Sequence, residues 1–138
     1  MRDVYYEIVV DPIAEARRYV ENAKELLKNH GQLDYENRFY GDRKYVRMAG
    51  NTLWNGMLLV LKATFQIKKN KGRLSIEDIR TVINKRDGKM MTLVNTAYDI
   101  MHLSMGYDGI LEKDVCSKGF QIANEIINRC GKLTKNGY

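Results

Sequence analysis

The sequence has little of the chemistry that metal sites and disulfide-stabilised folds require. Its 138 residues include only two cysteines, two histidines and one proline. Two cysteines are too few for a disulfide framework. Neither a CxxC pair nor an HExxH motif is present, so we predict no metal site. The phosphate-binding loop of P-loop proteins and the GxGxxG and GxSxG motifs are also absent. These absences argue against nucleotide hydrolysis, dinucleotide binding and α/β-hydrolase chemistry, and we expect no cofactor.

Long apolar runs are missing too. The longest, residues 57–61, is five residues long, whereas a helix needs about 20 apolar residues to cross a bilayer. The N-terminal segment carries Asp3 and Glu7 and has no long apolar stretch, which is unlike a secretory signal. We therefore expect a cytoplasmic protein that makes no use of a membrane.

What the sequence does contain is helical periodicity. Apolar residues recur at the three- and four-residue spacing of amphipathic helices in five stretches. These stretches span about 12–30, 42–69, 75–87, 89–104 and 112–131. We predict an all-α, up-and-down bundle of four to five helices. The bundle would occupy residues 11–131 as one domain, between an N-terminal arm at 1–10 and a flexible tail at 132–138.

Residues typical of helix termini support these boundaries. Asp11 is a good N-cap, and Pro12 loses no hydrogen bond at the first helical position. Ser75 and Asp78 have the spacing of a capping box. The second stretch is apolar on nearly every side in its C-terminal half, so we expect it to be the central helix. Gly50 and Gly56 inside this stretch indicate a close approach by a neighbouring helix, and the alternative is that the helix simply tolerates them.

The two cysteines are not expected to pair. Cys116 and Cys130 lie fourteen residues apart on the fifth predicted helix, a separation of roughly 21 Å at about 1.5 Å per residue. A disulfide requires Cα atoms within about 7 Å of each other. Both residues are therefore predicted to be free thiols, buried or half-buried in the core.

Positive charge is concentrated in one segment. The formal net charge is +6, and residues 68–89 hold eight Lys/Arg against three Asp/Glu. The basic residues of this segment are Lys68, Lys69, Lys71, Arg73, Arg80, Lys85, Arg86 and Lys89. Such a segment can attract the phosphates of RNA or DNA, or an acidic protein surface. The alternative is a solvated loop and helix face.

The fourth predicted helix carries the candidate catalytic residues. Asn95, Asp99 and His102 are spaced i, i+4 and i+7 and share one face. We hypothesise that Asp99 holds one ring nitrogen of His102 and leaves the other for proton transfer or phosphate binding. The alternative is an ordinary solvated face with a boundary histidine.

A second polar strip lies on the second predicted helix. It consists of Lys44, Arg47, Asn51 and Asn55. If the two strips face each other, within one chain or across a dimer axis, they form a polar pocket beside the hydrophobic core. The candidate residues of this pocket are Arg47, Asn51, Asn55 and Asn95.

The order of the predicted helices, with ARRYVENAKELL at 16–27 and AYDIMHLSMGYDG at 97–109, resembles that of HEPN-like bundles. More narrowly, the sequence is similar to a small, uncharacterised bacterial family of that type known from Bacteroidetes. The resemblance covers most of residues 11–130 and implies an up-and-down helical bundle that often dimerises. The superfamily includes RNA-cleaving toxins, partners of nucleotidyltransferases and many non-catalytic members.

The sequence departs from the catalytic members of that superfamily. Those members carry an arginine, then four to six residues, then a histidine. No arginine lies in the matching window 91–99 upstream of His102, so the cation that would stabilise a charged transition state is missing there. Only His102 carries over from the catalytic pattern.

Three functions are compatible with these observations. The first is a non-catalytic HEPN-like binding or assembly module, a homodimer that acts with a protein or nucleic-acid partner. The second is an RNA or DNA binder that uses the basic segment 68–89. The third is a degenerate ribonuclease in which His102 acts with Arg47 or another arginine brought in by folding. We rank them in that order.

Overall fold

The computed structural model describes residues 11–68 and 74–135. Within these ranges the chain forms an all-α bundle, as predicted, with no strand beyond one isolated bridge between Phe39 and Glu112. The elements are α1 (Pro12–His30), α2 (Arg43–Phe65), α3 (Ile76–Arg86), α4 (Gly88–Ala97), the π-helical η1 (Tyr98–Tyr107) and α5 (Lys113–Lys135). The predicted N-terminal arm at 1–10 lies outside the described residues, as does the end of the predicted tail.

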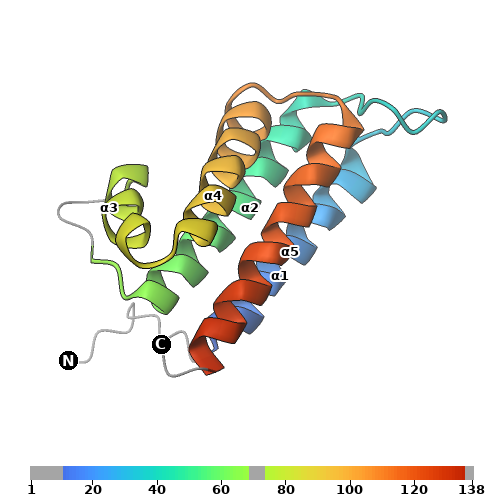
Figure 1. The fold of residues 1–138 in the computed structure, drawn as a ribbon. Coiled ribbons are helices and arrows are strands. Elements are labelled where there is room, and N and C mark those ends of the chain that lie inside the picture. The colour runs from blue at the N-terminus through green and yellow to red at the C-terminus, as the bar shows by residue number, and fades with distance from the viewer. Residues whose placement is uncertain (1–10, 69–73, 136–138) are drawn as a thin grey trace, which may run out of the picture.

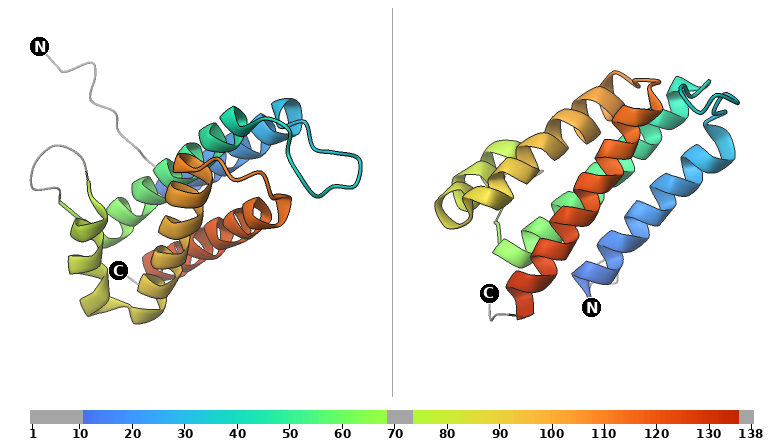
Figure 2. Two further views of the ribbon diagram at one scale, coloured as in Figure 1. Left: turned by 90° about the horizontal axis from the view of Figure 1, so that it is seen from above. Right: turned by 45° about the vertical axis from the view of Figure 1, so that its right-hand side comes forward.

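The body of the bundle is built from α1, α2 and α5, which run side by side (Figure 1). α4 continues directly into η1, and this pair lies along the same bundle (Figure 2). α2 packs against α1, α3, α5 and η1, which confirms its predicted central position. Its side chains Leu53, Met57 and Leu61 are fully buried. No helix in the described ranges combines the length and the apolar content that a membrane crossing requires.

α1 begins and ends where the sequence predicts. The Asp11 carboxylate accepts a hydrogen bond from the amide of Ala14 at 3.1 Å, and the amide of Gly31 donates to the carbonyl of Leu27. One stripe of α1 faces the core and consists of Ala16, Val20, Ala23 and Leu27. The N-cap and the apolar spacing therefore set this helix, as local signals usually do.

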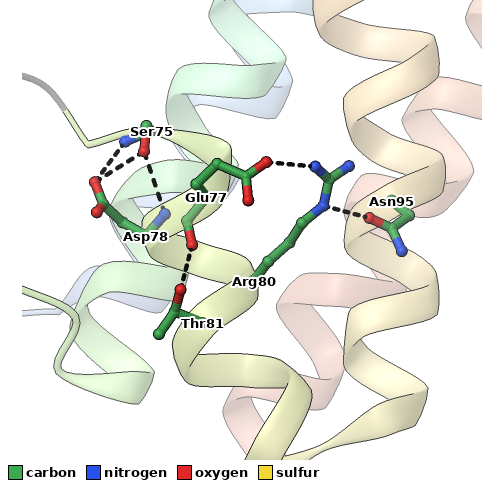
Figure 3. Close-up of polar contacts among 6 residues, drawn as sticks. All are labelled: Ser75, Glu77, Asp78, Arg80, Thr81 and Asn95. Carbon is green, nitrogen blue, oxygen red and sulfur yellow. Dashed lines mark hydrogen bonds and ion pairs between the residues drawn. The ribbon is translucent and has the colours of Figure 1, made fainter.

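A capping box begins α3, and the residue that ends α3 also contacts α5. The Ser75 hydroxyl accepts a hydrogen bond from the Asp78 amide at 3.2 Å, and the Asp78 carboxylate accepts one from the Ser75 amide at 2.9 Å (Figure 3). Asp87 ends α3 and begins α4, where its carboxylate accepts from the Met90 amide at 3.0 Å. The same carboxylate receives two hydrogen bonds of 2.9 Å from Arg129 of α5. One residue thus connects three helices.

α2 ends earlier than predicted. It stops at Phe65 rather than near residue 69, because Gln66 adopts a left-handed conformation with a φ of 54°. The Lys62 carbonyl accepts hydrogen bonds from the amides of both Gln66 and Ile67, and Ile67 is buried. A left-handed helix cap is usually glycine or asparagine, so the sequence carries no clear signal for this end.

Two later helices also differ from the prediction. The predicted helix 89–104 is α4 followed by the π-helical η1, which extends to Tyr107. α5 continues through Gly131 to Lys135 instead of ending at the glycine. Leu133 packs against the core beyond Gly131, and its burial outweighs the roughly 1 kcal/mol that a glycine costs a helix. The first part of the predicted flexible tail is therefore helical.

α2 and η1 approach each other closely at Gly50. A Cβ atom there would lie 2.6 Å from the carbonyl oxygen of Met101 and 2.6 Å from the amide nitrogen of Gly106. Only glycine fits at this distance, which confirms the predicted close approach. Asn51 Oδ1 would in turn lie 2.5 Å from a Cβ atom at Gly106. The polar side chain that follows Gly50 is thus placed directly against η1.

Candidate functional site

A groove of about 810 Å³ lies where α2, the start of α3 and η1 meet. We call it the aromatic groove. Its lining residues are Asn51, Trp54, Asn55, Leu58, Leu74, Ser75, Ile76, Tyr98 and His102. The structure therefore brings Asn51 and Asn55 of the α2 strip together with His102 of the other strip.

Three rings form a cluster at this groove. Tyr98 and His102 have ring centroids 5.1 Å apart, and Trp54 lies edge-on to Tyr98 at 5.6 Å. The Trp54 and His102 centroids are 6.0 Å apart. These separations fall in the range of favourable aromatic pairs. Arg80 of α3 places its guanidinium carbon 5.8 Å from the Tyr98 ring centroid, which adds a cation at the edge of the cluster.

His102 is the unusual member of the cluster. Its Nδ1 atom is buried and has no hydrogen-bond partner among the described residues. Buried polar atoms are nearly always paired, so an unpaired one requires an explanation. Asp99, the hypothesised partner of His102, does not pair with this atom. It is exposed and makes no hydrogen bond or ion pair within the described ranges. The structure does not form the Asp99–His102 pair.

Two other candidate residues hold the fold together instead of lining the groove. The Asn95 amide oxygen accepts a hydrogen bond from Arg80 Nε at 3.3 Å, while Arg80 Nη1 pairs with Glu77 at 2.9 Å (Figure 3). Arg47 Nε donates to the Tyr107 carbonyl at 3.1 Å, at the end of η1. Of the four predicted pocket residues, Asn51 and Asn55 line the aromatic groove, and Asn95 and Arg47 do not.

The cations of the basic segment have different surroundings. Lys69, Lys71 and Arg73 lie outside the described residues. Arg86 donates to the Phe65 carbonyl at 3.0 Å and lies over the Phe65 ring, so it supports the end of α2. Lys68 lies beside α2, Lys89 lies beside α5, and Lys85 is exposed. Within the part of the chain that the structure covers, Lys68 and Lys89 line two separate hollows.

The cysteines are poorly suited to nucleophilic chemistry. Cys116 and Cys130 are buried free thiols on α5, in agreement with the prediction that they do not pair. Burial raises the pKa of each thiol to about 11, so the reactive thiolate is scarce at neutral pH. Over residues 11–68 and 74–135, no group of His, Cys, Asp and Glu side chains could hold a metal ion.

Sequence reasoning missed three residues of the site. It gave Tyr98 no role, counted Arg80 only as part of the basic segment, and did not foresee that Trp54, which is a core residue, also lines the groove. The four-residue spacing of Tyr98 and His102 was a usable signal, because side chains four apart on a helix are neighbours. Nothing in the sequence indicates that Trp54 and Arg80, which come from other helices, join them.

The described residues form an all-α bundle with a groove lined by aromatic and amide side chains. The chain belongs to the DUF5618 family, a domain of unknown function whose model matches residues 11–132. It is similar to the solved structure of a protein of unknown function from Dyadobacter fermentans, with 36% sequence identity and a TM-score of 0.80. That match covers 88% of this chain and 94% of the other. No curated protein matches the sequence.

Proposed function

We propose that the chain is a non-catalytic binding module of the HEPN-like type that acts as a homodimer. Its ligand-binding surface is the aromatic groove. The observation that carries this proposal is the convergence of a three-ring cluster, which includes His102, and two primary amides on one open hollow. The groove is bordered by η1, and π-helical segments frequently occur at functional sites.

The groove favours binding over catalysis. Acid–base chemistry on a phosphodiester needs a proton acceptor and a cation that reach the same group. His102 lacks a carboxylate partner among the described residues. Arg80, which borders the cluster, already has both Glu77 and Asn95 as partners, and Arg47 is bound to a backbone carbonyl. A role for His102 in RNA cleavage is therefore the weakest of the three functions.

The chemistry of the lining indicates the class of ligand. Aromatic faces bind planar groups, and an asparagine amide offers both hydrogen-bond donors and an acceptor to the edge of such a group. A base of single-stranded RNA has a planar face and a polar edge of this kind. RNA binding is accordingly the second candidate function, and Arg80 beside Tyr98 favours it because a guanidinium plane can also stack on a base.

Titration with labelled single-stranded RNA and duplex DNA at several salt concentrations tests the RNA candidate. Trp54 is the sole tryptophan, so its emission reports occupancy of the groove while polarisation reports binding anywhere on the protein. We expect Tyr98→Leu to weaken RNA binding roughly 5- to 150-fold, since one base–aromatic stack contributes about 1–3 kcal/mol. Tyr107→Leu is the matched control, because this η1 tyrosine is 77% exposed and does not line the groove.

Three outcomes separate the functions. Binding that leaves Trp54 emission and the Tyr98→Leu affinity unchanged would place RNA on the basic segment rather than in the groove. Absence of binding to either nucleic acid would exclude the RNA candidate. RNA shortened by the wild-type protein and left intact by His102→Ala, with unchanged stability of the variant, would refute the non-catalytic assignment.

A further inference from the structure

A second hollow of about 670 Å³ adjoins the aromatic groove on the C-terminal half of α2. We call it the apolar trough. Leu58, Leu59 and Ala63 lie on its α2 side, and Ile67 and Pro12 lie at its end. Figure 2 shows that the start of α1 and the end of α2 lie at the same end of the bundle. The trough therefore presents an apolar strip that no described element covers.

The charged residues of the apolar trough are all of one sign. Among the described residues, Lys62 and Lys68 line it and no Asp or Glu does. Both lysines are exposed, and neither forms an ion pair with a described residue. An apolar strip with positive side chains along it is complementary to a partner that is apolar on one face and acidic on the flanks.

This charge argues against a second copy of the chain as the occupant. In a two-fold symmetric contact the same surface meets itself, so each residue near the axis faces its own counterpart. Lys62 and Lys68 would then lie near the same lysines of the other copy, and like charges brought together in an interface are unfavourable. A symmetric second copy therefore does not supply the complementary surface.

We propose that the apolar trough is the docking site for an acidic amphipathic helix of a partner protein. From Asn55 to the C-cap Gln66 the trough follows twelve residues of α2 and its end, a rise of roughly 17 Å or three helical turns. A partner helix of about 12 residues matches this length. Helices that dock in grooves insert apolar anchors at positions i, i+3 or i+4, and i+7. Glutamates or aspartates beside these anchors would pair with Lys62 and Lys68.

Selection from a displayed library of 14-residue helical peptides tests the proposal with the full-length protein as bait. We expect the enriched sequences to combine an apolar stripe with a net negative charge. In the Lys62→Glu/Lys68→Glu variant, the affinity of an enriched, labelled peptide should fall at least tenfold. The matched control is Lys118→Glu/Lys132→Glu, which makes the same change of charge at exposed positions on α5 and should leave affinity unchanged.

A second variant tests the trough by shape instead of charge. Ala63→Trp places a bulky side chain at an exposed position of the trough and should reduce peptide affinity without lowering thermal stability. Enrichment of basic or uncharged peptides would overturn the proposal, as would no enrichment at all. Equal affinity in the two double variants would also overturn it. Loss of RNA binding in the Lys62→Glu/Lys68→Glu variant, with no peptide selected, would assign the trough to nucleic acid.

Discussion

The Asp87 side chain makes the stability of this protein depend on pH through its pair with Arg129. Its side chain is 8% exposed and that of Arg129 is 30% exposed, so the pair is largely shielded from water. The hydrogen bonds from Arg129 lower the pKa of the Asp87 carboxyl below its ordinary value. The folded state therefore binds this proton more weakly than the unfolded state. The resulting stabilisation is complete at neutral pH and is lost as the pH falls below about 4, through the lowered folded-state pKa.

We expect Arg129→Met to lower the free energy of unfolding at pH 7 by about 2 kcal/mol, because hydrogen bonds to a charged group contribute about 1.5–3 kcal/mol. The stability of the variant should also fall less steeply between pH 5 and pH 2. Urea unfolding at a series of pH values measures both effects. Arg18→Met is the control, since the exposed Arg18–Glu15 pair should contribute less than about 1 kcal/mol. Identical pH slopes for Arg129→Met and wild type would contradict the assignment.

The residues that sequence reasoning located correctly act through their neighbours in the chain. Asp11, Ser75 and Asp78 cap helices within three residues of themselves, so the sequence contains the whole interaction. The Asp99–His102 contact does not form in η1, which is π-helical. The i→i+5 hydrogen bonding of a π-helix differs from the α-helical pattern that the prediction assumed.

At the scale of helices, the contact between α2 and η1 depends on Gly50. We expect Gly50→Ala to destabilise the protein by about 1–3 kcal/mol, the usual cost of overpacking, although alanine is the better helix former. The clash is with backbone atoms of Met101 and Gly106, which cannot move aside as a flexible side chain could. Thermal unfolding followed by circular dichroism measures the effect.

Gly131 provides the matched control within α5. A Cβ atom there would meet nothing within 4 Å, so Gly131→Ala should stabilise the protein by about 0.5–1 kcal/mol through helix propensity alone. If both substitutions stabilised the protein, the close approach of α2 and η1 would not constrain the sequence at Gly50. If Gly50→Ala lowers stability and Gly131→Ala raises it, the difference between the two substitutions is due to packing.

The presence of the helices was predictable from this sequence. Two helix ends and one change of helix type were not. The end of α2 depends on Gln66 in a left-handed conformation, which the residue type does not indicate. The change from α4 to η1 occurs where the chain packs against α2, and no break in periodicity marks it. α5 passes Gly131 because Leu133 packs against the core. Each of these features follows from tertiary packing, which overrides local preference.

At the scale of the whole molecule, the proposed homodimer has a direct test. We expect sedimentation at micromolar concentration to give a particle of about twice the 16.0 kDa chain mass. The Lys62→Glu/Lys68→Glu variant should sediment as the wild-type protein does, because the apolar trough is assigned to a different partner. A monomer at all concentrations up to about 100 μM would refute the homodimer, since a functional dimer requires tighter association than that.

The class of fold follows from the whole sequence more securely than the binding surfaces do. Apolar spacing predicted the core stripe of α1 and the central place of α2 correctly. The basic segment shows the limit of such reasoning. Arg80 and Arg86 are close in sequence to exposed lysines, yet in the fold they support Tyr98 and Phe65. Charge counted along a chain does not distinguish a cation that supports the fold from one that meets a partner.

The small size of α3 has a dynamic consequence for the aromatic groove. This helix supplies one wall through Ile76, yet among its residues only Ile79 and Ile83 are buried. Segments with little buried apolar surface have the lowest free energies of local opening. The amide protons of α3 are therefore expected to exchange with solvent before those of α1, α2 and α5. A groove with one such wall fluctuates in width while the remaining helices stay folded. A ligand that binds α3 would slow the exchange of the α3 amide protons.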